Sequence, residues 1–131
     1  MNPYTKDELL LITKSVMKIL DNWELNSFQI ISILGLPDKT PKRNINKYRN
    51  NLSFPYEKEI FERLEHIIGI SDALRTTFPR NQHMASGWLK TEHRRFNNKA
   101  PIEVIIHEGL NGLRKIRSEL DCTFAWDTTT G

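Results

Sequence analysis

The sequence predicts an all-α protein, with an N-terminal helix-turn-helix domain followed by a small C-terminal helical module. Apolar residues recur at spacings of three and four along most of the 131-residue chain, which is typical of amphipathic helices. Helix start and stop signals flank these runs, and the content of 38% hydrophobic and 27% charged residues fits an ordinary globular protein. Because proline disfavours helix at the preceding residue, we expect a boundary at Phe78-Pro79, between domains of residues 1–78 and 79–131.

The first helix is expected over about residues 6–22. Thr5 and Glu8 form a T-x-x-E capping box directly before an apolar run with helical spacing. Trp23 continues the apolar face and is expected to pack in the core rather than to serve as an exposed anchor. The face as a whole consists of Leu9, Ile12, Val16, Ile19, Leu20 and Trp23.

Two short helices should follow, joined by a tight turn. An N-cap at Asn26 and a left-handed stop at Gly35 delimit a helix over residues 28–34. The pair Thr40-Pro41 repeats the start signal and predicts a helix over residues 41–50. This is the layout of a helix-turn-helix motif, whose second helix enters the major groove of DNA.

The helix over residues 41–50 carries the basic focus of the chain, because five basic residues and no acid occur between Lys39 and Arg49. Its apolar residues fall on one side and its polar residues on the other. Arg and Lys donate to guanine or to phosphates, and Asn pairs with adenine, so the polar side has the residue types of base readout. The alternative is an ordinary solvated basic helix face. The predicted DNA-binding residues are Thr40, Lys42, Arg43, Asn46, Lys47, Arg49 and Asn50, opposite Ile45, Tyr48 and Leu52.

A longer helix is expected to begin at Ser53-Phe54-Pro55 and to end near Phe78. Gly69 marks either a bend in this helix or the end of one helix before a new cap at Ser71, and the sequence does not decide between them. The residues predicted to be buried are Ile60, Leu64, Ile67, Ile68 and Leu74.

The C-terminal module begins with a predicted helix over residues 80–91. A connector over residues 92–99 is rich in His, Arg and Asn and contains one aromatic residue, Phe96. Pro101 suits the first position of the next helix, and Gly109 closes that helix.

A last helix should begin at Leu110. Its apolar positions recur at spacings of three and four, which places them on one face. Two aromatic residues, Phe124 and Trp126, lie on the tail beyond it and either pack back on the protein or bind a partner.

Several classes of function find no support in the sequence. No apolar run approaches the ~20 residues of a membrane span and the N-terminus is polar, so we expect a cytoplasmic protein without a membrane partner. One cysteine, Cys122, excludes an internal disulfide framework. Glycine-rich phosphate-binding motifs and metal-ligand spacings of histidine are lacking, so no cofactor, metal or catalytic residue is predicted. A carboxylate pair formed across the fold is what a small helical enzyme would require.

A run of ordered elements in the C-terminal half carries a resemblance to a known family. It comprises Trp88-Leu89, Asn97-Asn98, the run from Ala100 to Ile105, the run from Gly109 to Arg117, and Leu120-Asp121. With Leu34-Gly35-Leu36 and the helix from Arg63 to Leu74 in the N-terminal half, the chain resembles antitoxins of the Xre/MbcA/ParS type over most of its length.

One departure from the family pattern lies just before Pro101. The usual glycine is replaced, because Asn98-Lys99-Ala100 precede the proline. Asparagine tolerates a left-handed backbone, so we expect the turn to persist.

The resemblance implies a non-enzymatic type II antitoxin with an Xre-like helix-turn-helix domain and a C-terminal toxin-binding and dimerisation domain. Its partners would be a cognate toxin, most often a RES-domain protein that consumes NAD, together with operator DNA. A homodimer or a larger hetero-oligomer with the toxin is expected. The alternative is a stand-alone dimeric helix-turn-helix regulator with no toxin partner.

Toxin contact is expected on the connector from Trp88 to Lys99 rather than on the apolar stripe from Ile102 to Leu120, because interfaces favour aromatic and arginine anchors. The candidate toxin-binding residues are Trp88, Leu89, Arg94, Arg95, Phe96, Asn97, Pro101, Phe124 and Trp126.

Overall fold

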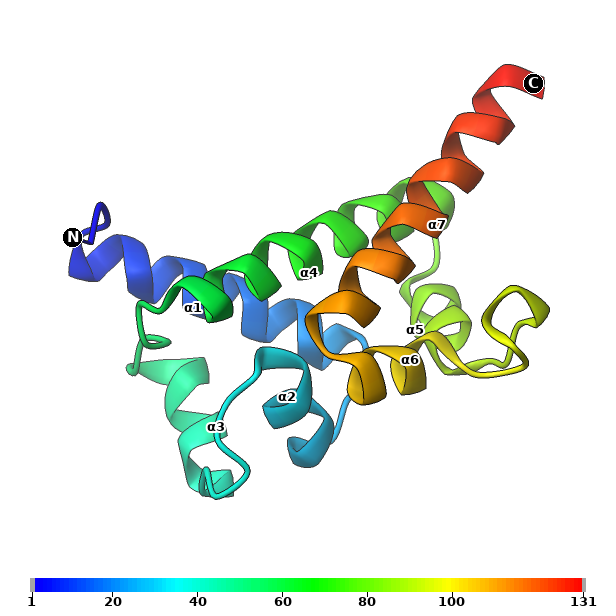
Figure 1. Ribbon diagram of the computed structural model, residues 1–131. Coiled ribbons are helices and arrows are strands. Elements are labelled where there is room, and N and C mark those ends of the chain that lie inside the picture. The colour runs from blue at the N-terminus through cyan, green and yellow to red at the C-terminus, as the bar shows by residue number, and fades with distance from the viewer. Residues whose placement is uncertain (1, 131) are drawn as a thin grey trace.

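The computed structural model describes residues 2–130, except for the side chains of residue 82 and residues 122–130. Over this part of the chain the fold is all-α, with seven α-helices, a short 3-10 helix and no sheet (Figure 1). The elements are α1 (Lys6–Asn22), α2 (Ser27–Leu34), α3 (Lys42–Asn50), α4 (Lys58–Thr77), α5 (Gln82–Lys90), η1 (Arg94–Phe96), α6 (Pro101–Glu108) and α7 (Leu110–Thr130).

The first two helices begin as the sequence predicts. At α1, the Thr5 side chain accepts a hydrogen bond from the Glu8 backbone, and the Glu8 carboxylate accepts one from the Thr5 backbone. At α2, Asn26 and Gln29 form the same reciprocal pair, although a capping box was not predicted there. Gly35 ends α2 in a left-handed conformation with φ 71°, as expected.

The connection between α2 and α3 is longer than predicted. Residues 35–41 separate the two helices, whereas a helix-turn-helix motif has a turn of about three or four residues. Thr40 does not cap α3, because its hydroxyl donates to the Pro37 carbonyl oxygen at 2.6 Å and Pro41 takes the N-cap position. Leu52, predicted on the buried side, lies beyond the helix end and is 38% exposed.

Helix α4 begins at Lys58, later than predicted, because the preceding segment is held in an extended form. The Phe54 backbone N–H donates to the Thr13 hydroxyl at 2.9 Å, and the Phe54 ring packs against Tyr48 with centroids 5.0 Å apart. From Lys58 to Thr77 the helix is continuous, so Gly69 is neither a break nor a new start.

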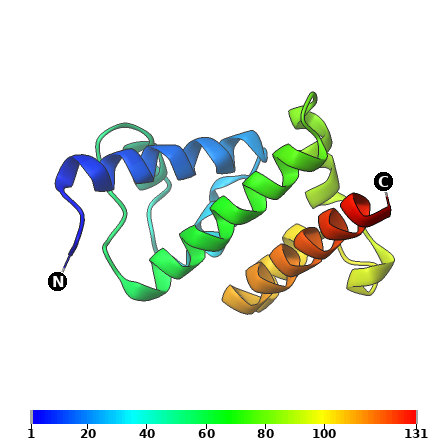
Figure 2. The same cartoon turned by 90° about the horizontal axis from the view of Figure 1, so that it is seen from above.

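The core is built where α4 lies along α7, as Figure 2 shows, and where α7 folds back on α6. Gly112 permits the second contact, because a Cβ there would lie 2.5 Å from the Val104 carbonyl oxygen and 2.9 Å from the Ile105 Cα. Ile68 was predicted to be buried and is instead 40% exposed. The other predicted core positions of α4, namely Ile60, Leu64, Ile67 and Leu74, are buried.

One hydrophobic cluster contains residues from both sides of the boundary predicted at residues 78 and 79. Leu64 and Leu74 of α4 belong to it together with Leu113 and Ile116 of α7. The division into two domains therefore stays a prediction. Among the described residues, no helix is both long and apolar enough to cross a membrane.

Candidate nucleic-acid and protein-binding surfaces

Helix α3 presents a basic outer face. Ile45 and Tyr48 are buried against the body of the protein, which turns the opposite side of the helix to solvent. Lys42, Arg43 and Lys47 are exposed there, and in the part of the chain that the structure describes their side chains form no ion pair. This side, which we call the α3 outer face, consists of Lys42, Arg43, Asn46, Lys47 and Asn50.

Arg49 is engaged within the protein. Its Nε and Nη2 donate to the two carboxylate oxygens of Asp21 on α1, at 2.9 and 2.8 Å. The hydrogen bond to Asp21, and then the charge of that carboxylate, raise the pKa of Arg49 above its ordinary value, against an opposing effect of burial. The remaining Nη1 donates to Asn46 Oδ1. Arg49 thus fixes α3 to α1 and is less suited to a phosphate contact than the three unpaired cations.

The amide of Asn50 closes the C-terminal end of the α3 outer face. Its Nδ2 donates to the Asn46 carbonyl oxygen at 2.9 Å, which leaves Asn50 Oδ1 as an exposed acceptor. Thr40, the remaining predicted DNA-binding residue, is half-buried in the loop before α3. The structure therefore places five of the seven predicted residues on one exposed face, with Arg49 and Thr40 beside it in supporting contacts.

A second surface is the connector loop over residues 92–99, which folds back on itself around η1. The His93 backbone N–H donates to the Lys99 carbonyl oxygen at 3.2 Å, and the Asn98 N–H donates to the His93 carbonyl oxygen at 3.0 Å. Asn97 and Asn98 take left-handed conformations, with φ 56° and 61°. The expected tolerance of asparagine for this backbone is confirmed, and the loop presents its polar side chains in a fixed shape.

The aromatic residues of this region hold the loop from within. Phe96 is 5% exposed and meets the Trp88 ring edge-on at 6.2 Å, while His93 Nε2 lies 3.0 Å from the Trp88 carbonyl oxygen. Leu89 and Pro101 are also buried. Trp88 is half-buried, so among the apolar candidates it retains some exposed surface.

The exposed toxin-binding candidates on the loop are Arg94, Arg95 and Asn97. They border a hollow of about 270 Å³ between η1 and α6–α7, where Arg95 lies 3.6 Å from Glu119. The other two candidates, Phe124 and Trp126, have side chains outside the described residues. The predicted set thus divides into polar residues that face solvent and apolar residues that support them.

The two surfaces lie at opposite sides of the molecule, with α3 at one side and the connector loop at the other (Figures 1 and 2). One partner bound at α3 would leave the connector loop free for another.

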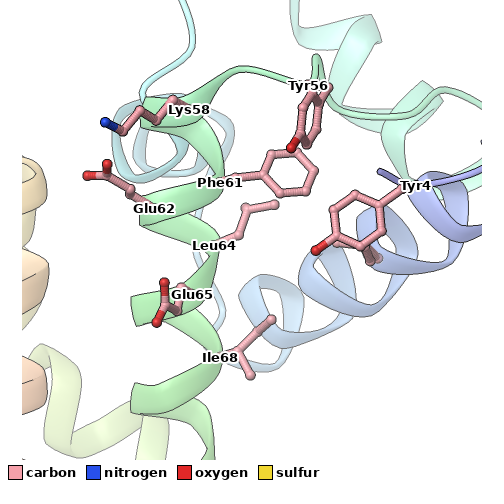
Figure 3. A pocket seen from close by; sticks show the side chains of 9 residues that line it. Tyr4, Tyr56, Lys58, Phe61, Glu62, Leu64, Glu65 and Ile68 are labelled. Atoms are coloured by element: carbon pink, nitrogen blue, oxygen red, sulfur yellow. The ribbon is translucent and has the colours of Figure 1, made fainter. Parts of the chain in front are cut away.

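Two features of the fold escaped the sequence analysis. Asp21 was read only as a polar residue of the first helix, and its pairing with Arg49 brings together residues 28 positions apart. An aromatic hollow of about 580 Å³ lies between α1 and α4, where the rings of Tyr4, Tyr56 and Phe61 contact one another (Figure 3). Its sequence signal, three aromatic residues flanking two helix starts, is visible only once α1 and α4 are placed side by side.

Among the described residues, no group of three or more His, Cys, Asp or Glu side chains is arranged to hold a metal ion. No protein-family model matches the chain, and a comparison with curated proteins finds no matching sequence.

Proposed function

We propose that this protein is a type II antitoxin that binds DNA through the α3 outer face and binds its toxin through the connector loop over residues 92–99. The observation that carries the proposal is the separation of two unlike surfaces, one basic and one built from polar side chains over an aromatic support, on one small helical fold. The motif order that resembles Xre/MbcA/ParS antitoxins adds the identity of the partners. The toxin would be a RES-domain protein that consumes NAD.

The DNA-binding half is supported by the unpaired cations of α3. Lys42, Arg43 and Lys47 are exposed and no acidic residue occurs within the helix. Such cations bind phosphates and displace counterions, which provides most of the affinity for DNA. The Asp21–Arg49 pair supports the same role, because it holds α3 at a fixed position against α1.

The toxin-binding half is supported by the rigid form of the connector loop. Its backbone hydrogen bonds and the buried Phe96 fix Arg94 and Asn97 before any partner arrives. A preorganised loop loses less conformational entropy on binding, which favours affinity. Trp88, half-buried beneath the loop, provides the kind of aromatic residue that interfaces enrich.

Co-expression with the product of the neighbouring gene tests the toxin half. Both proteins should be expressed from unrelated promoters, so that repression of the natural operon plays no part. We expect the neighbour to arrest growth and this protein to relieve the arrest. Arg94→Ala with Lys99→Ala should weaken the relief, because both side chains are exposed on the loop, whereas Arg43→Ala with Lys47→Ala on α3 should leave it intact.

The alternative is a stand-alone dimeric regulator. It is favoured by the same α3 outer face, because repressors of this kind read two half-sites about one helical turn apart. The mass of the protein purified together with its neighbour separates the two proposals. A stable hetero-complex supports the antitoxin, while a homodimer that excludes the neighbour supports the regulator.

A further inference from the structure

We propose that the centre of the α3 outer face offers only hydrogen-bond donors to a base pair, so that the protein reads guanine there rather than adenine. This inference rests on the proposed DNA binding and specifies its substrate. It follows from the way Arg49 occupies one atom of Asn46.

The side chain of Asn46 is oriented by a chain of contacts that begins on α1. The Asp21 carboxylate holds the Arg49 guanidinium with two hydrogen bonds of 2.9 and 2.8 Å. The Nη1 of that guanidinium donates to Asn46 Oδ1. Because a guanidinium only donates, the amide atom that faces it must be the oxygen. Asn46 Nδ2 is therefore the atom left for a partner, and among the described residues it has none.

This orientation changes what Asn46 can recognise. A free asparagine pairs with adenine by donating to N7 and accepting from N6 at the same time. With its Oδ1 occupied, Asn46 keeps only the donor half of that pattern. The major-groove edge of guanine presents two acceptors, O6 and N7, and matches a surface that only donates.

The neighbours of Asn46 have the same character. Arg43 and Lys47 are exposed on the same face and carry donors and no acceptor. The exposed acceptor Oδ1 of Asn50 lies at the last residue of α3, while recognition helices contact bases mainly through their N-terminal residues. Guanine is therefore expected at the centre of each half-site, and adenine or cytosine only at the position next to Asn50.

Selection from a pool of random double-stranded DNA with the full-length protein tests the inference. The pool should be long enough for two half-sites one helical turn apart. The position read by Asn46 is the one whose preference disappears in Asn46→Ala. We expect guanine at that position in the wild-type selection, with a wrong base there weakening binding by about 5- to 150-fold.

A second variant tests the cause. Arg49→Met keeps a long side chain and removes the N–H that occupies Asn46 Oδ1, so the amide regains both halves of the adenine pattern. We expect the selected base at the Asn46 position to change from guanine to adenine. Lys14→Met is the matched control, because it removes one exposed charge from α1 without touching α3, and it should select the wild-type sequence.

The outcomes separate this inference from the proposed function. Adenine at the Asn46 position in the wild type, no base preference there, or an Arg49→Met selection that keeps guanine would each overturn the donor-only reading while DNA binding stands. A protein that recovers no DNA from the pool at low salt overturns the DNA-binding proposal, and the inference with it.

Discussion

The α3 outer face and the junction around Arg63 use the same kind of side chain in opposite ways. Arg43 is exposed and forms no ion pair among the described residues. Arg63 of α4 is only 11% exposed, and its Nη1 donates to the carbonyl oxygens of Ser32 and Ile33 at 3.2 and 3.4 Å. These carbonyls belong to the last turn of α2, where a cation is favoured by the helix dipole.

The difference shows which basic residues are available to a partner. The Arg63 guanidinium ends α2, lies against Gly35 and also approaches Gly109 between α6 and α7. One side chain thus joins the helix-turn-helix region to the C-terminal module. Substitutions at this junction should change stability first, whereas substitutions on the α3 outer face should change binding first.

The largest effect on stability is expected at the closest contact of the interior. Gly112→Ala places a Cβ against the backbone of Val104 and Ile105, which cannot move aside as a side chain would, and should lower the free energy of unfolding by about 3 kcal/mol. Gly87→Ala is the matched control, because a Cβ there meets nothing within 4 Å. The control should raise the free energy of unfolding by about 0.5–1 kcal/mol. Urea unfolding measures both, and equal effects would contradict the close contact of α6 and α7.

Arg63→Met should have the next largest effect. It removes the donors that satisfy the α2 carbonyls and should cost about 2 kcal/mol, the usual size for hydrogen bonds from a charged group. Arg75→Met is the control, because Arg75 is 75% exposed and paired only with the neighbouring Asp72, and it should change stability by less than about 0.5 kcal/mol. If the two variants unfold at the same urea concentration, Arg63 does not hold the junction.

A smaller effect is expected from pH at the contact of α4 with α7. His66 Nδ1 lies 3.3 Å from Arg117 Nη1 and accepts its hydrogen bond only when the imidazole is neutral. Burial, and then the charge of Arg117, lower the pKa of His66 below its ordinary value of 6.5, with Arg114 adding to the effect and Glu65 and Glu62 opposing it.

The unfolded state therefore binds the proton more readily than the folded state. The contribution of His66 is complete above pH 6.5 and is lost as the pH falls through the lowered pKa. His66→Gln retains an acceptor without a titratable group, so its free energy of unfolding should fall less than that of the wild type between about pH 7 and pH 5. Parallel pH profiles would exclude this role.

Features that depend on neighbouring residues were predictable from the sequence. The capping box of Thr5 and Glu8, the stop at Gly35 and the left-handed asparagines of the connector loop each depend on a few adjacent positions. The basic outer face of α3 was predictable for the same reason, because helical spacing alone places Arg43 and Lys47 opposite Ile45.

Features that depend on distant residues were not predictable. The start of α4 is set by a hydrogen bond between Phe54 and Thr13, 41 positions apart. Gly69 lies within a continuous helix because the Arg117 guanidinium of α7 occupies the space where a side chain would lie. In the same way, only the assembled fold shows that Arg49 contacts Asp21 and that Phe96 is buried beneath the connector loop.

The most direct test of the account is the affinity for the operator, measured over a range of salt concentrations, of two variants with the same change in composition. Arg43→Ala with Lys47→Ala removes one arginine and one lysine from α3, and Arg94→Ala with Lys99→Ala removes the same pair from the connector loop. We expect the α3 variant to lose about 100-fold in affinity and about two units of salt slope, and the loop variant to bind as the wild type does. Equal losses in the two variants, or a larger loss in the loop variant, would contradict the assignment of DNA binding to α3.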